Sequence, residues 1–97
     1  MANLFSDITA TSVIYVALCT HCNLCKIGTT NNLSGRTKTL RTANPYLQML
    51  YFGSGSYLME GHFHRLFEDK KVRGEWFDLD SEDIRLLVEG FEFQKIG

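Results

Sequence analysis

The sequence of 97 residues has little that marks a membrane or a secreted protein. It contains no apolar run near the roughly 18 residues that a membrane span needs. Residues 1–7 lack the basic start and the long apolar stretch of a signal peptide. The sequence has three cysteines. Its apolar content of 44% is enough to form a core without stabilising disulfides. We therefore expect a cytoplasmic protein with reduced thiols and no membrane partner.

The sequence also lacks an excess of charge of one sign, because its formal net charge is −1. No global basic character therefore indicates a nucleic-acid binder. The distribution is uneven, however. Residues 1–59 hold four basic side chains and one acidic one, whereas residues 60–97 hold six basic and ten acidic ones. A basic first part is compatible with a surface that faces phosphates.

Internal repeats, low-complexity segments and long linkers are absent as well. This length predicts one domain, over residues 1–97, that buries roughly two thirds of its unfolded surface. Within it we expect an N-terminal arm over residues 1–12, a core region over residues 13–79, and a C-terminal helix and tail over residues 80–97.

Three apolar runs rich in β-branched and aromatic residues predict strands, over residues 13–18, 25–30 and 46–52. The first two are joined by a short turn, which favours an antiparallel hairpin. The fold class predicted is α+β, with a small three-stranded antiparallel sheet flanked by helices.

Three helices are predicted between and after these strands. Asn31 or Asn32 can cap a helix that begins at residue 33 and ends before Pro45. A second helix follows the turn at residues 53–56. Its expected core stripe consists of Met59, Phe63, Leu66 and Phe67. A third helix begins at residue 80 or 81, runs through residue 88, and is ended by Gly90.

Tyr15 and Lys26 lie on the two strands of the predicted hairpin, and Arg36 lies on the helix that follows. Side chains on adjacent strands come within contact distance when they share a face. A phenol, an amine and a guanidinium on one sheet face suit a phosphate better than an apolar core. These three residues are the first candidates for a functional site.

The residues that carry a family resemblance follow in chain order. They are V-I-Y-V, K-I-G and Arg36, then Asn44-Pro45, then Glu60 with His64 and Phe67, and finally Arg73-Gly74-Glu75-Trp76-Phe77. This order resembles the GIY-YIG nuclease superfamily. It is most similar to the small branch common in phages and other viruses, in which K-I-G replaces Y-I-G and a G-E-W-F motif follows. The resemblance covers residues 13–79.

The resemblance implies a DNA endonuclease that hydrolyses phosphodiester bonds and depends on Mg²⁺ or Mn²⁺. In this reading Tyr15 or Lys26 is the base that activates water, and Arg36 stabilises the charge of the transition state. Glu60 is the implied metal ligand, since Mg²⁺ accepts one carboxylate together with waters and substrate oxygens. His64 relays a proton, contacts phosphate, or orients Glu60.

Lys38, Arg41 and Arg73 are expected to contact the nucleic-acid backbone. So few basic residues predict a low affinity for free DNA, because phosphate contacts supply most of the non-specific affinity. A homodimer or a protein partner would then help to hold the substrate.

Two other readings remain open. Many GIY-YIG nucleases carry an asparagine after the metal-binding glutamate, and this chain has none beyond Asn44. That departure favours a catalytically inactive domain of the same fold, which binds nucleic acid or a protein partner. The second alternative is a zinc-stabilised adaptor. Its ligands would be Cys19, His21, Cys22 and Cys25, which are the right ligand types crowded around one turn.

Overall fold

The computed structural model describes residues 12–55 and 57–96. Most of the predicted N-terminal arm lies outside these residues. The strands are β1 (Val13–Cys19), β2 (Leu24–Thr30), β3 (Leu47–Ser54), β4 (Lys71–Arg73), β5 (Trp76–Phe77) and β6 (Gln94–Lys95). The helices are α2 (Leu33–Ala43), α3 (Tyr57–Leu66) and α4 (Ser81–Arg85), with a 3₁₀ turn η1 (Glu68–Lys70) and a π-helical turn η2 (Leu86–Gly90). None of the described helices is long and apolar enough to cross a membrane.

The described strands form one sheet in the order β4-β5-β2-β1-β3-β6, and every neighbouring pair is antiparallel. The predicted three-stranded sheet is therefore wrong, although the α+β class is correct. β1, β2 and β3 are the three strands that the sequence indicated. The other three contain only two or three residues each. Such short segments cannot display the alternation by which a strand is recognised.

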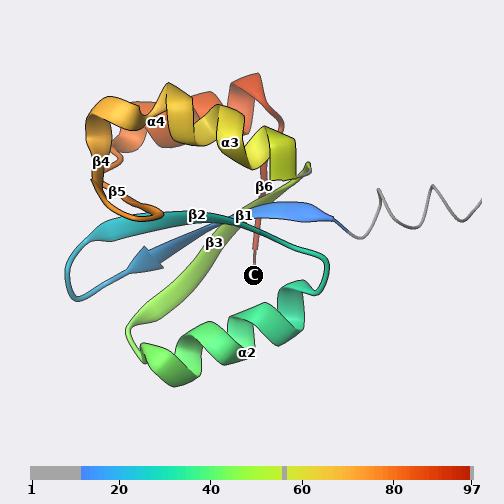
Figure 1. The fold of residues 1–97 in the computed structure, drawn as a ribbon, viewed down its shortest axis with the longest axis vertical. Coiled ribbons are helices and arrows are strands. Elements are labelled where there is room, and N and C mark those ends of the chain that lie inside the picture. Colours follow the sequence, from blue (N-terminus) through green and yellow to red (C-terminus); the bar gives the residue numbers. More distant parts are fainter. Residues whose placement is uncertain (1–11, 56, 97) are drawn as a thin grey trace, which may run out of the picture.

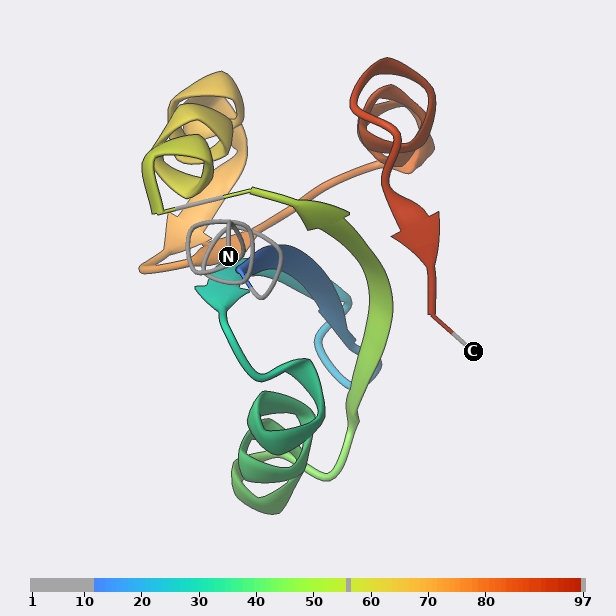
Figure 2. The same cartoon turned by 90° about the vertical axis from the view of Figure 1, so that its right-hand side faces the viewer.

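The sheet is covered on both faces (Figures 1 and 2). Helix α2 lies on one face, whereas α3 and α4 lie on the other. A large core fills the α3 side, made by Ile14, Val16, Cys25, Ile27, Phe63, Phe67, Phe77, Leu87 and Phe93. A small core fills the α2 side, made by Tyr15, Ala17, Leu47 and Met49. Successive residues of β1 alternate between the two cores, as the pleat of a strand requires.

Helix α2 has the predicted ends. Asn32 caps it, because the side-chain oxygen accepts a hydrogen bond from the Gly35 backbone N–H at 3.0 Å. The helix stops at Ala43, and Asn44 takes an extended conformation before Pro45. The helix has no buried residue of its own.

The buried face of α3 differs from the predicted core stripe. Phe63 and Phe67 are buried as expected, but Met59 is 37% and Leu66 42% exposed. Glu60 takes the place of Met59 on the inner face and is only 8% exposed. The apolar pattern misplaced this face because a glutamate is seldom buried unless its oxygens have partners.

The third helix is shorter than predicted. Asp80 caps α4 in a reciprocal capping box with Asp83, through hydrogen bonds of 2.9 and 3.0 Å. Lys70 Nζ also binds Asp83 Oδ2 at 2.6 Å, which ties η1 to the start of α4. Beyond Arg85 the chain continues as the π-helical turn η2, which ends at Gly90 as expected.

Gly28 on β2 leaves space for the ring of Tyr15 on β1, because these two residues are register partners. A Cβ at position 28 would lie 2.6 Å from Tyr15 Cζ. Replacing Gly28 by alanine is therefore expected to destabilise the fold by about 1–3 kcal/mol, as overpacking does. Urea unfolding measures this change.

Gly61→Ala is the matched control for that experiment. A Cβ there would meet only Arg65 Nη1, at 3.6 Å. Alanine inside a helix is favoured over glycine by up to ~1 kcal/mol. A Gly28→Ala variant as stable as Gly61→Ala would show that the Tyr15 ring does not occupy this space.

Candidate active site at the free end of β2

Tyr15 and Arg36 form the first part of the candidate site, on the α2 side of the sheet. Tyr15 is fully buried, and its ring lies over Gly28. Arg36 Nη1 donates to the Tyr15 hydroxyl oxygen at 3.5 Å, while the arginine as a whole is exposed. The phenol and the guanidinium, which the sequence placed near one sheet face, therefore contact each other. It also explains the glycine of K-I-G, because any larger residue would displace the phenol.

Lys26 lies on the same sheet face as Tyr15, since its register partner on β1 is Ala17. Its Nζ lies 3.0 Å from Glu75 Oε1 and 5.6 Å from the centre of the Trp76 ring. An ion pair and a cation–π contact therefore hold the ammonium against β5. Its closest described partner is a carboxylate, not the phenol.

Glu60 and His64 form the second part of the site, on the α3 side. The Thr29 hydroxyl donates to Glu60 Oε1, and His64 Nε2 lies 3.5 Å from Glu60 Oε2. His64 Nε2 is also 3.1 Å from the Ile27 carbonyl oxygen. Because a carbonyl only accepts, we assign the proton of the neutral ring to Nε2. These contacts compensate the cost of burying a carboxylate and fix its orientation.

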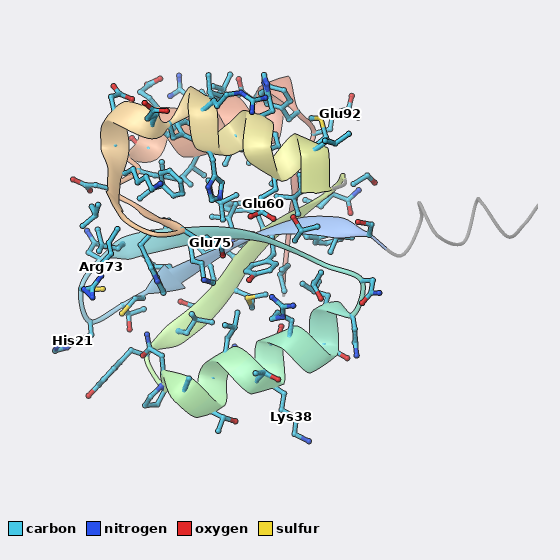
Figure 3. The ribbon with its side chains drawn as sticks, in the orientation of Figure 1. His21, Lys38, Glu60, Arg73, Glu75 and Glu92 are labelled. Atoms are coloured by element: carbon cyan, nitrogen blue, oxygen red, sulfur yellow. The ribbon has the colours of Figure 1, made fainter. Side chains whose placement is uncertain are left out.

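A pocket of about 580 Å³ opens beside Glu60. Its lining consists of Leu58, Glu60, Gly61, His64 and Arg65 from α3, and Gly74 and Glu75 from the turn between β4 and β5. Two carboxylates, one histidine and one arginine therefore face a space large enough for hydrated ligands. Figure 3 shows Glu60 between α3 and the sheet, with Glu75 beside β2.

The two parts of the site are attached to consecutive residues of β2. Gly28 supports Tyr15 on one face, and Thr29 binds Glu60 on the other. No hydrogen bond or ion pair among the described residues joins the Tyr15–Arg36 pair to the Glu60–His64 pair. The nearest link runs through Glu75, which lines the pocket with Glu60 and binds Lys26. β5 pairs with β2 only at Cys25 and Lys26, so within residues 12–55 and 57–96 the far end of β2 has no strand beside it on that edge.

A comparison with family models decides the assignment of the chain. The T5orf172 domain model matches residues 12–92, which include every residue of the candidate site. The chain belongs to the T5orf172 domain family. This family is phage-type and nuclease-like. No curated protein and no solved structure matches the chain. Membership of the GIY-YIG superfamily stays a prediction.

The predicted nucleic-acid contacts of this T5orf172 domain lie on two separate elements. Lys38 and Arg41 are exposed on α2, the helix that carries Arg36. Arg73 is exposed on β4, where it borders a smaller pocket with Cys22 and Trp76. Figure 3 shows Lys38 pointing outward from α2 and Arg73 near the turn between β1 and β2. They are accessible but do not form one continuous basic patch.

Thr29 and Glu75 are the two site residues that the sequence argument missed. Thr29 is two residues after Ile27, so both side chains point to the sheet face on which α3 packs. This spacing could have predicted that Thr29 faces α3. Glu75 lies in the G-E-W-F motif, which reads as a structural anchor because Trp76 and Phe77 dominate it. Nothing in the local sequence indicates that Glu75 reaches Lys26.

The zinc adaptor is not supported by the placement of the cysteines. Cys25 is buried in the large core on the α3 side of the sheet. Cys19 is the register partner of Leu24, the residue before Cys25, so Cys19 lies on the opposite face. Consecutive strand residues point to opposite faces, so Cys19 and Cys25 cannot share a tetrahedral ion. Within residues 12–55 and 57–96, no group of three or more potential ligands is positioned to hold a metal.

Glu60 is compatible with a metal bound together with substrate. Mg²⁺ prefers oxygen ligands and is often held by one or two carboxylates, with waters and phosphate oxygens completing its octahedron. A single buried carboxylate on a wide pocket meets this description. Mn²⁺ accepts the same oxygen ligands.

Proposed function

We propose that this T5orf172 domain is a metal-dependent DNA endonuclease of the GIY-YIG type, which hydrolyses phosphodiester bonds. The nuclease-like family supports a function of this class. The observation that carries the proposal is the fixed Glu60 carboxylate at the wall of the 580 Å³ pocket, oriented by Thr29 and His64. A buried carboxylate held by two partners is expensive to maintain, which favours a chemical role over a structural one.

In this proposal Glu60 holds Mg²⁺ or Mn²⁺. When bound, such an ion supplies positive charge to the scissile phosphate and lowers the pKa of a coordinated water. Thr29 and His64 act as positioning residues, because each engages one oxygen of Glu60. Partners of this kind fix the orientation of a metal ligand.

Arg36 is proposed to bind the phosphate and to stabilise the charge that develops on it. Its planar fork matches two phosphate oxygens at once, and its exposure makes it accessible to DNA. The Tyr15 hydroxyl touches this guanidinium, whereas Lys26 is engaged by Glu75. We therefore propose Tyr15, not Lys26, as the group that takes a proton from water, which requires that its fully buried hydroxyl become accessible when DNA binds Arg36.

Lys38, Arg41 and Arg73 are proposed to add contacts to the DNA backbone. With three such residues and a net charge of −1, the domain is expected to bind free DNA weakly. A second copy or a protein partner would raise the affinity by adding a second point of attachment.

Incubation of the purified chain with supercoiled plasmid tests the proposal directly. Nicking or linearisation is expected with Mg²⁺ or Mn²⁺ and is expected to disappear when EDTA removes the metal. Absence of cleavage with either metal, at protein concentrations where DNA binding is measurable, would rule out the nuclease.

Tyr15→Phe separates the chemical role of the phenol from its packing role. The ring stays in place, so the free energy of unfolding is expected to change by less than about 1 kcal/mol. The cleavage rate is expected to fall about 100-fold, as for the loss of a general base. Tyr46→Phe is the control, since Tyr46 is exposed and outside the site. Unchanged cleavage by Tyr15→Phe would transfer the base role to Lys26.

One observation favours a second candidate function, an inactive module that binds nucleic acid or a protein. Tyr15 is fully buried, and both oxygens of Glu60 already have protein partners. In such a module these contacts would serve only to stabilise the fold. Plasmid that stays intact while the wild-type chain binds it would support this reading.

A further inference from the structure

Cys19 and Cys22 lie in C-x-x-C spacing where β1 turns into β2, apart from the candidate active site. The Asn23 backbone N–H donates to the Cys19 carbonyl oxygen at 2.7 Å, and Asn23 has a φ of 60°. The chain therefore reverses sharply here. Residues three apart in a tight turn have Cα atoms within about 7 Å of each other. Disulfides bridge Cα atoms at up to about 6.8 Å.

The sulfur of Cys19 has a polar environment although the residue is buried. Asn44 Nδ2 donates to Cys19 Sγ at 3.5 Å. Asn44 is itself fixed, because its backbone N–H binds the Leu40 carbonyl and its Oδ1 accepts from the Tyr46 N–H. The Asn44 amide, followed by the backbone N–H and the thiol of Cys22, lowers the pKa of Cys19 to about 7. Much of Cys19 is therefore thiolate near neutral pH.

The other two cysteines differ from Cys19 in opposite ways. Cys22 is exposed to solvent, so reagents reach it freely, but the hydrogen bond that its thiol gives to Cys19 raises its pKa. Cys25 is buried in the large core, and burial, followed by the charges of Asp78 and Asp83, raises its pKa to about 11. Cys25 is therefore inert and provides an internal reference within the same chain.

We propose that Cys19 and Cys22 form a redox site that small disulfides, such as glutathione disulfide, convert reversibly to a Cys19–Cys22 disulfide. The site is independent of the proposed nuclease activity. No third ligand joins the pair among the described residues, which favours bond formation between the two sulfurs over metal binding.

The reaction proceeds by two thiol–disulfide exchanges. The Cys19 thiolate accepts the proton of the Cys22 thiol that hydrogen-bonds to it. Cys22, the accessible sulfur, then attacks one sulfur of the small disulfide, forms a mixed disulfide and releases one small thiolate. Cys19, whose pKa is about 7, loses this proton again to the released thiolate or to solvent. The Cys19 thiolate then attacks Cys22 Sγ, forms the intramolecular bond and releases the second small thiolate. The two protons of the cysteine pair end on the two released thiols. Two electrons pass from the protein to the small disulfide.

Differential alkylation of the wild-type chain tests this proposal. The full chain is equilibrated in glutathione buffers from fully reduced to fully oxidised and then quenched in acid. Free thiols are labelled under denaturing conditions, the protein is reduced, and the newly released thiols receive a second label. Tandem mass spectrometry then assigns each label to its cysteine.

The second label is expected on Cys19 and Cys22 together, increasing with the oxidised fraction of glutathione, while Cys25 carries the first label throughout. Cys19→Ser is expected to stop at a mixed disulfide with glutathione on Cys22. Absence of the Cys19–Cys22 bond in fully oxidised buffer, or a bond that includes Cys25, would overturn the proposal.

Asn44→Ala examines the activation of Cys19 without removing a sulfur. Loss of the amide is expected to raise the pKa of Cys19, since the hydrogen bond that stabilises the thiolate is gone. The pH at which the intramolecular bond forms at half its maximal rate is expected to shift upward. An unchanged pH profile in a folded variant would contradict Cys19 as the activated sulfur.

Discussion

Replacing Glu60 by glutamine is expected to lower the rate of plasmid cleavage at least about 100-fold, a loss typical of removing one preorganised catalytic group. The amide has the shape of the carboxylate, and its oxygen can still accept the hydrogen bond from Thr29. The negative charge that would hold Mg²⁺ is lost, however. Cleavage rates measured over a series of Mg²⁺ concentrations, together with urea unfolding, separate a loss of chemistry from a loss of structure.

Glu89→Gln is the matched control, because Glu89 is exposed on η2 and does not line the pocket. It removes the same charge from the chain and is expected to cleave like the wild type. If Glu60→Gln is folded and cleaves plasmid at the wild-type rate, Glu60 is not the metal ligand. The proposed endonuclease would then lack the carboxylate on which it depends.

Replacing Arg36 by alanine is expected to reduce cleavage about 100-fold or more, since a guanidinium that stabilises developing phosphate charge is removed. Arg36 is exposed but is the partner of the buried Tyr15 hydroxyl, so the free energy of unfolding is expected to fall by about 1 kcal/mol. Arg36→Lys keeps the charge but loses the two-pronged contact, and is expected to restore only part of the activity. Single-turnover cleavage at saturating DNA measures the chemical step.

Arg85→Ala supplies the control for Arg36. Arg85 is also an exposed helical arginine, but it lies on α4 and pairs with Glu82. The same loss of binding in both variants would reflect the general charge of the protein. A defect of Arg36→Ala that disappears at saturating DNA would make Arg36 a binding residue without a role in the transition state.

Much of the fold could be predicted because its main elements have local signals. β1, β2 and β3 are long apolar runs, and Asn32 and Pro45 delimit α2 through their own backbone chemistry. The short strands β5 and β6 exist only because β2 and β3 offer them hydrogen-bonding partners, and β4 pairs in turn with β5. A partner that is distant in sequence leaves no local pattern, which is why the sheet was predicted with half its strands.

The candidate site divides in the same way. The pairing of Tyr15 with Arg36 follows from strand and helix positions that the sequence reveals. The burial of Glu60 does not, because its inner position depends on hydrogen bonds from Thr29, and on His64 beside it, that form only in the folded chain. The apolar pattern of the helix favoured Met59 on the inner face. In the folded chain Glu60 occupies that face instead, because Thr29 and His64 satisfy its carboxylate oxygens.

The attachment of the phenol and the carboxylate to neighbouring residues of β2 makes the site sensitive to strand alignment. A slip of one residue would exchange the faces of Gly28 and Thr29. The ring of Tyr15 would then meet a threonine side chain, and Glu60 would lose its hydroxyl donor. A single misalignment would therefore dismantle both halves at once, so that DNA cleavage would also serve as a functional readout of correct hairpin assembly.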